Sequence, residues 1–137
     1  MDKEKPDTRA FGSIAEELEG RFCAGVQAPW TSTEFERQAL NVFRLQFEVC
    51  ETYRSFCEGR GVTPSTVSGW EDVPAVPATA FKYFDFVSGR PGADGAVFRT
   101  SGTTRGEGHR GRHHVPRLAL YRASLLPPFQ AALLPED

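Results

Sequence analysis

Residues 31–58, TSTEFERQALNVFRLQFEVCETYRSFCE, form the longest periodic segment of the chain and decide how the rest is interpreted. Apolar and aromatic residues recur in it at three- and four-residue steps, which is the spacing of one face of an α-helix. Thr31 offers a hydroxyl cap, and Glu34 complements the positive end of the helix dipole in the first turn. Gly59 supplies a stop signal. The segment therefore predicts one helix over residues 32–58, with its aromatic stripe packed in the core.

Two shorter helices are expected on either side of this segment. Between residues 13 and 24, apolar residues alternate with glutamates at helical spacing, whereas the polar residues 1–12 are expected to form a frayed N-terminus. A second apolar pattern predicts a helix over residues 116–134, because proline is well tolerated at the first helical position. Pro127 and Pro128 are expected to break or kink that helix in its middle.

Two short strands are expected between the helices. Residues 62–79 are rich in proline and predict an extended connection. The aromatic run that follows predicts a strand near residues 83–88, or one helical turn followed by a strand, and a short apolar run predicts a second strand near 96–100. Turn residues within 89–95 indicate that the two strands form a hairpin. The expected fold class is α/β in a single domain.

The composition narrows the functional classes. Sixteen basic and eighteen acidic residues give a formal charge of -2, so no overall field would draw the chain to nucleic acid. No apolar run reaches the roughly 20 residues that span a bilayer, and the polar N-terminus lacks the apolar region of a signal peptide. We therefore expect a cytoplasmic protein with no nucleic-acid partner and no membrane span.

The cysteines and histidines do not predict a metal site. Cys23, Cys50 and Cys57 are an odd set without C-x-x-C spacing, so reduced thiols are expected. Cys50 and Cys57, seven residues apart on the predicted helix, are expected to be small apolar core residues. A glycine- and arginine-rich run without an obvious carboxylate or thiolate partner holds all the histidines: His109, His113 and His114. Because this run is too rich in glycine to be helical, it predicts a solvated cationic loop.

The stretch Thr100-Ser101-Gly102-Thr103-Thr104-Arg105-Gly106 follows directly on a predicted strand and carries the candidate chemistry. Glycines allow backbone N–H groups to approach phosphate oxygens closely, and hydroxyl groups donate further hydrogen bonds or contact Mg²⁺. The adjacent Arg105 adds a charge-assisted donor. This composition suits a polyphosphate cradle, and an ordinary solvent-facing loop is an equal alternative from composition alone.

Two better-known nucleotide-binding patterns do not fit. No Gly-x-x-x-x-Gly-Lys run followed by Ser or Thr occurs, so the loop is not a Walker-type P-loop. Residues 106–111, GEGHRG, match G-x-G-x-x-G by letter. They do not sit at a tight strand-to-helix junction, which disfavours dinucleotide binding.

The order of residues in the loop resembles the phosphate-binding signature of adenylate-forming enzymes. Within that superfamily the chain resembles the acyl-protein synthetases, also called long-chain-fatty-acid luciferin-component ligases, in residues 98–104, 109, 120–125 and 129. The upstream segment 73–82 is similar to that family's proline-rich segment ending in Phe-Lys. The resemblance covers residues 35–134.

This resemblance implies that residues 13–137 are the N-terminal part of an adenylate-forming, acyl-activating fold. It implies ATP-dependent activation of a fatty or other carboxylic acid to an acyl-adenylate, with pyrophosphate leaving, and transfer of the acyl group to a protein thiol. ATP and Mg²⁺ are the implied cofactors, and an acyl-accepting or reductase protein is an implied partner. The implied cofactor-binding residues are Thr100, Ser101, Gly102, Thr103, Thr104, Arg105, Gly106 and His109.

Departures from the family pattern limit what the chain is expected to do alone. Arg105 stands where many members have glycine, and no Pro-Lys-Gly follows, although Arg110 and Arg112 supply positive charge. The adenine-binding motif, hinge acid and catalytic lysine of full-length enzymes have no counterpart, so no catalytic residue is assigned. We expect a truncated ligase chain that is inactive by itself. The alternative is a catalytically silent fragment or interaction module with at most weak nucleotide binding.

Overall fold

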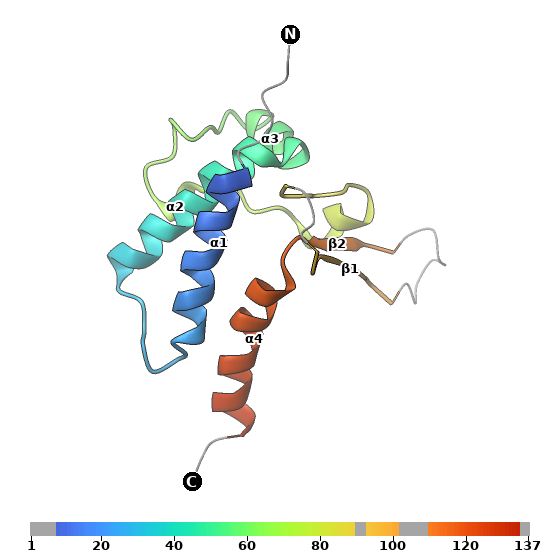
Figure 1. Ribbon diagram of the computed structural model, residues 1–137. Coiled ribbons are helices and arrows are strands. Elements are labelled where there is room, and N and C mark those ends of the chain that lie inside the picture. Colours follow the sequence, from blue (N-terminus) through green and yellow to red (C-terminus); the bar gives the residue numbers. More distant parts are fainter. Residues whose placement is uncertain (1–7, 90–92, 102–109, 135–137) are drawn as a thin grey trace.

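The computed structural model describes residues 8–89, 93–101 and 110–134. These residues combine helices with one small sheet, which confirms the predicted mixed α/β class (Figure 1). The finer expectation of an adenylate-forming fold stays a prediction. In chain order the elements are α1 (Thr8–Cys23), α2 (Ser32–Val49), α3 (Glu51–Glu58), the 3₁₀ helices η1 (Trp70–Asp72) and η2 (Ala78–Lys82), β1 (Ala96–Arg99), β2 (Arg112–Val115) and α4 (Leu118–Leu133).

Helix α1 packs along α4, far from it in sequence, and against α2 (Figure 1). It begins at Thr8, so residues 8–12, which the sequence predicts to be frayed, are helical. Arg117, just before α4, binds Glu19 of α1 at 2.8 Å and Glu16 at 3.8 Å. This pairing fixes the entry of α4 against the middle of α1.

Helix α4 continues through Pro127 and Pro128, so the predicted break does not occur, and it begins at Leu118 instead of residue 116. A proline removes one backbone donor and sets its ring against the carbonyl of the fourth residue before it. Here the helix is braced from outside, because Pro127 lies against the turn after α1, within reach of Gly25. Packing against α1 therefore overrides the local preference.

The predicted helix over residues 32–58 is two helices that part at Cys50. Thr31 caps α2 with a capping box, since its hydroxyl accepts from the Glu34 amide and the Glu34 carboxylate accepts from the Thr31 amide at 2.8 Å. Cys50 is extended, with φ -106° and ψ 96°. The Arg54 guanidinium donates to the carbonyls of Phe47 and Glu48, which the break leaves without helical partners. This side chain explains the break that periodicity misses.

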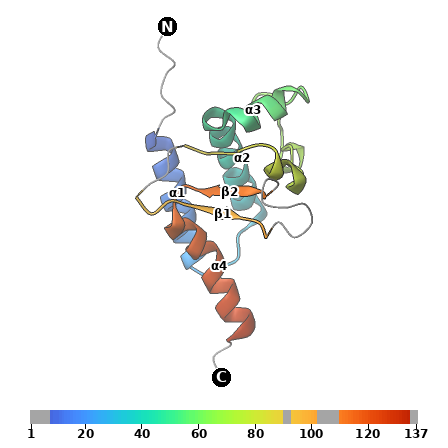
Figure 2. The same cartoon turned by 90° about the vertical axis from the view of Figure 1, so that its right-hand side faces the viewer.

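The hairpin predicted between residues 83–88 and 96–100 does not form, because β1 has a different partner strand. Residues 83–88 form no strand, and β1 pairs instead with β2, antiparallel, from Ala96 opposite Val115 to Arg99 opposite Arg112. Figure 2 shows the two strands side by side, next to the helices. The run predicted as a solvated cationic loop therefore contains a strand, and the connection between the paired strands is the Thr/Ser/Gly stretch.

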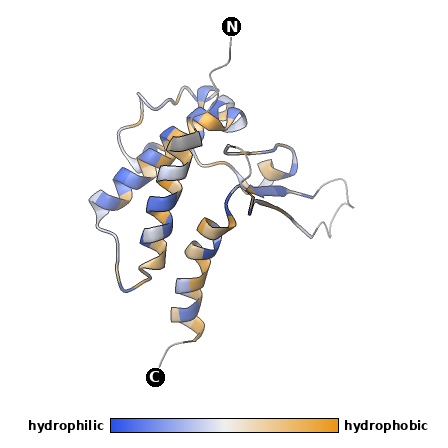
Figure 3. Cartoon of the chain, in the orientation of Figure 1, coloured by the Kyte–Doolittle hydropathy of each residue, from blue (hydrophilic) through white to orange (hydrophobic). Residues whose placement is uncertain are grey.

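Few side chains are fully buried, and most of them come from the helices. Figure 3 shows that apolar residues colour much of α4, in contrast to the polar outer faces of α1 and α2. Among the described residues, no helix is both long and apolar enough to cross a membrane. Over the described ranges, the residues that bury a side chain are Ala15, Gln38, Phe43, Leu45, Cys50, Cys57 and Ala123.

Candidate polyphosphate site at the end of the hairpin

Thr100 and Gly111 close the hairpin at the point where the Thr/Ser/Gly stretch leaves it. The Thr100 amide donates to the Gly111 carbonyl at 3.0 Å, and the Gly111 amide donates to the Thr100 hydroxyl oxygen at 2.9 Å. Gly111 is buried, and a Cβ added to it would lie 3.3 Å from the Phe81 carbonyl oxygen. Glycine at this position therefore lets the hairpin rest directly on the backbone of η2.

The structure describes two of the predicted cofactor-binding residues. Thr100 and Ser101 follow β1 directly, and both are exposed. The Thr100 amide is already used within the hairpin, whereas its hydroxyl accepts one hydrogen bond and keeps its own proton for donation. The other predicted site residues lie outside the described residues: Gly102, Thr103, Thr104, Arg105, Gly106 and His109.

Arginines gather at the same end of the hairpin. Arg99 and Arg112 are paired directly across the two strands, next to the closing residues Thr100 and Gly111. Arg110 is exposed at the end of the connection. Like charges that face each other on opposite strands destabilise a sheet. Within the described part of the chain, no carboxylate forms an ion pair with Arg99 that would offset this repulsion. An anion bound at this end would relieve the repulsion.

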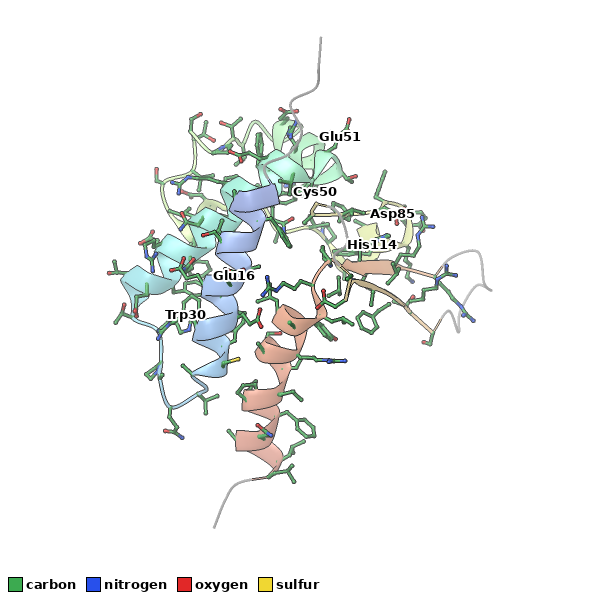
Figure 4. All side chains as sticks on the ribbon, viewed as in Figure 1. Glu16, Trp30, Cys50, Glu51, Asp85 and His114 are labelled. Carbon is green, nitrogen blue, oxygen red and sulfur yellow. The ribbon has the colours of Figure 1, made fainter. Side chains whose placement is uncertain are left out.

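Asp85 holds Arg112 on its other side. The guanidinium donates to both carboxylate oxygens, at 2.9 and 2.7 Å, and Nε2 of His114 lies 3.2 Å from Oδ1 (Figure 4). The hydrogen bond from His114, with the nearby charge of Arg112, lowers the pKa of Asp85. The carboxylate therefore stays ionised and neutralises part of the charge on Arg112. Sequence analysis does not single out Asp85, because it lies in a run of aromatic residues that resembles a strand.

The two histidines of β2 attach the hairpin to the segment before it. The His113 ring stacks on Phe81 at 4.7 Å between centroids, and Phe81 also contacts Phe86 at 5.0 Å. His114 binds Asp85. Within the described residues no group of three or more His, Cys, Asp or Glu side chains could hold a metal ion.

An apolar cavity of about 750 Å³ lies on the far side of Phe81. It is open to the surface, residues of α1, α2 and α3 and of the segment 73–86 line it, and Phe81 is part of its wall. The hairpin end and this cavity are therefore joined through one residue. The cavity is lined by Leu18, Phe22, Trp30, Phe35, Gln38, Ala39, Val42, Phe43, Gln46, Tyr53, Val73, Val76, Phe81 and Phe86.

The buried thiols are poor candidates for covalent chemistry. Cys50 and Cys57 are both buried, and burial raises the pKa of Cys57. The thiolate is the nucleophilic form, so a raised pKa lowers reactivity. Both cysteines pack as small core residues, in agreement with the interpretation drawn from the sequence.

A comparison of the chain with family models, with curated proteins and with solved structures found no match. The functional argument therefore rests on the chain's own residues. Three observations bear on it: the arginines at the hairpin end, the exposed hydroxyls of Thr100 and Ser101, and the apolar cavity behind Phe81.

Proposed function

We propose that this chain supplies the ATP-phosphate-binding part of an ATP-dependent acyl-activating ligase of the acyl-protein-synthetase type. In this role the hairpin end holds the β- and γ-phosphates of ATP. A carboxylate oxygen of a fatty or other carboxylic acid attacks the α-phosphorus, and the bond to pyrophosphate breaks. The thiol of a protein partner then attacks the acyl carbon of the acyl-adenylate, so that a thioester forms, the bond to AMP breaks, and AMP and the thiol proton are released. A cytoplasmic setting is part of the proposal.

The observation that carries the proposal is the pairing of Arg99 with Arg112 beside Thr100 and Ser101. Departing pyrophosphate gathers negative charge, and fixed cations and hydrogen-bond donors stabilise such charge without reorganising. Arg99 supplies a cation with no ion-pair partner among the described residues, and the two hydroxyls supply donors. The sequence resemblance in residues 98–104 points to the same chemistry.

The described residues fit an anion better than an isolated metal ion. In the described part of the chain, the carboxylate that contacts Arg112 is Asp85, and it is already bound to Arg112 and His114. Mg²⁺ usually keeps several waters and is bound through one or two carboxylates together with substrate phosphates. We therefore propose that Mg²⁺ is bound mainly by the phosphates of ATP, with the hydroxyls of Thr100 or Ser101 as its protein ligands.

Calorimetric titration with Mg-ATP tests the proposal. Arg99→Gln removes one cation from the hairpin end, and loss of one charge-assisted contact weakens binding by about tenfold. Arg44→Gln on α2 is the matched control, because it removes the same charge from an exposed arginine elsewhere. Equal affinities of the parent and Arg99→Gln, or an equal loss in both variants, would contradict the proposed site.

A catalytically silent module is the second candidate, and one observation favours it. The amide of Thr100 is engaged within the hairpin, which removes one donor that a phosphate loop would use. Exchange of labelled pyrophosphate into ATP in the presence of fatty acids separates the two candidates. Exchange demonstrates acyl-adenylate formation, whereas Mg-ATP binding without exchange identifies the silent module; we expect no exchange from these 137 residues alone.

A further inference from the structure

Helix α4 has one broad apolar face that no other described residue covers. Its opposite side packs on α1 and the turn after it, through Ala123 and Pro127. On the uncovered side, large apolar side chains are about half exposed, and this half of the helix extends beyond the rest of the molecule (Figure 1, Figure 2). The face continues onto β1, where Phe98 contacts the Tyr121 ring. We call it the α4 patch, and it consists of Phe98, Tyr121, Leu125, Leu126, Phe129 and Leu133.

The α4 patch is large enough for a specific interface. A large apolar residue presents roughly 200 Å² when fully exposed, so six residues that are each about half exposed offer roughly 600 Å². Apolar patches of that size on a monomer often serve an interaction. Two such patches that face each other bury about 1,200 Å² in total, which is the lower end of the range for specific protein–protein interfaces.

The charge of α4 restricts the chemistry of the partner. Residues 118–134 include no acidic residue and a single basic one, Arg122. Arg122 is exposed and lies on the patch, because Leu126 and Phe129 follow it by four and seven residues on the same helix face. Within the described ranges it forms no ion pair. A strongly acidic or basic partner therefore finds little to pair with, and an apolar, nearly neutral surface fits best.

Spacing and charge both select a second copy of the same helix. From Tyr121 to Leu133 an apolar residue recurs every four positions, which makes one continuous ridge, and helices pack most commonly through two ridges of this kind. If two copies pack antiparallel about an axis between Leu125 and Phe129, Arg122 lies across from the last turn of the other α4. That turn carries the negative end of the helix dipole and no basic residue of its own. Each copy therefore supplies the cation that the other lacks.

We propose that this protein forms a symmetric antiparallel homodimer through the α4 patch, with Arg122 of each copy at the C-terminal end of the other copy's α4. A parallel pair would bring the two arginines together and leave both helix ends without a cation. The inference does not rest on the proposed function, since self-association and Mg-ATP binding are measured independently and either can fail without the other.

Sedimentation velocity over a range of protein concentrations tests the dimer. Because the interface is at the small end of the specific range, we expect the dimer to dissociate with a constant in the micromolar range, visible between about 1 and 200 µM. A monomer at every concentration in that range overturns the proposal and leaves the patch to a different partner. Open-ended growth beyond the dimer overturns it as well, because the proposed contact is closed by its symmetry.

Phe129→Glu tests whether the patch is the interface. It places a carboxylate near the proposed two-fold axis, so we expect the dissociation constant to rise at least tenfold. Phe84→Glu is the matched control, because the two phenylalanines are 53% and 58% exposed and Phe84 lies beside α3. It should dimerise as the parent does. An undiminished dimer in Phe129→Glu, or an equal loss in both variants, overturns the proposal, and circular dichroism establishes that each variant folds.

Arg122→Gln tests the antiparallel arrangement. Two charge–dipole contacts are lost in each dimer, so we expect about tenfold weaker dimerisation at low salt and a smaller loss at high salt. Arg44→Gln, which removes an exposed arginine from α2, is the control and should leave dimerisation unchanged. A tighter dimer in Arg122→Gln is the result expected of a parallel pair. That result, or no change, overturns the arrangement.

Discussion

Replacing Asp85 with Asn should lower stability and strengthen anion binding at once. The change removes one negative charge, breaks the bidentate pair with Arg112 and weakens the contact with His114. The side chains of Arg112 and Asp85 are 52% and 40% exposed, and exposed pairs contribute roughly 0.2–1 kcal/mol. Because the Arg112–Asp85 pair is bidentate, we expect the free energy of unfolding to fall by about 1 kcal/mol. This loss lowers the melting temperature by about 4 °C in a domain of this size.

The same change releases the positive charge of Arg112 toward the hairpin end. A unit charge at about one Debye length, ~8 Å, from the two net charges of Mg-ATP contributes ~1 kcal/mol at the dielectric of water, which salt screening reduces to ~0.4 kcal/mol. Mg-ATP should therefore bind about twofold more tightly to Asp85→Asn than to the parent. Thermal denaturation gives the stability, and calorimetry gives the affinity.

A matched control separates this local effect from net charge. Glu48→Gln on α2 removes the same charge from an exposed carboxylate elsewhere. We expect it to leave both the melting temperature and the Mg-ATP affinity near those of the parent. Weaker binding of Mg-ATP to Asp85→Asn, or an equal gain in Glu48→Gln, would show that Asp85 does not neutralise Arg112 at the anion site.

Three further predictions concern stability and reactivity. Thr31→Ala removes the hydroxyl that caps α2 and should lower the free energy of unfolding by about 1 kcal/mol in urea denaturation. The Thr31 amide and hydroxyl lower the pKa of Glu34 from its usual 4.5, so the stability that Glu34 contributes through them is present above that value and is lost as pH falls through the lowered pKa. The variant keeps the bond from the backbone amide at position 31 and loses both bonds of the hydroxyl, so the difference in stability between parent and variant should narrow in acid without vanishing. Phe43 is only 3% exposed, so Phe43→Ala should lower the free energy of unfolding in urea by about 3–5 kcal/mol. A loss below about 1 kcal/mol would show that α2 does not pack as described. Cys23 is exposed, whereas Cys57 is buried and has a raised pKa. A thiol reagent should therefore label Cys23 before Cys57 in the native protein. Labelling of both cysteines at the same rate would contradict the burial of Cys57.

A capping signal in the sequence predicts where α2 begins, but no local signal predicts where it ends. The start of α2 follows from Thr31 and Glu34, three residues apart, and the structure confirms it. The break at Cys50 depends on Arg54 reaching back to backbone carbonyls of the preceding turn. No periodicity in the apolar residues announces such a contact, so a single helix is the natural prediction.

Strand pairing depends on contacts that are distant in sequence. The sequence does not predict β2, because its residues are mostly polar and follow a glycine-rich run: Arg112, His113, His114 and Val115. It is a strand because His113 stacks on Phe81 and because Arg112 and His114 both bind Asp85. These partners lie roughly thirty residues away, beyond the reach of local pattern reasoning.

The candidate site was predictable in composition and only partly in geometry. The sequence predicts a strand directly before Thr100, and β1 confirms it. The pairing of Arg99 with Arg112 and the neutralising role of Asp85 required the register of the hairpin.

Amide chemical-shift mapping by NMR with Mg-ATP would locate the proposed phosphate site, because it reports where on the chain the nucleotide binds. We expect the largest shifts on Thr100, Ser101, Arg110 and Gly111, and hardly any change in the residues that line the apolar cavity. No saturable shifts, or largest shifts on the helices away from the hairpin, would contradict it.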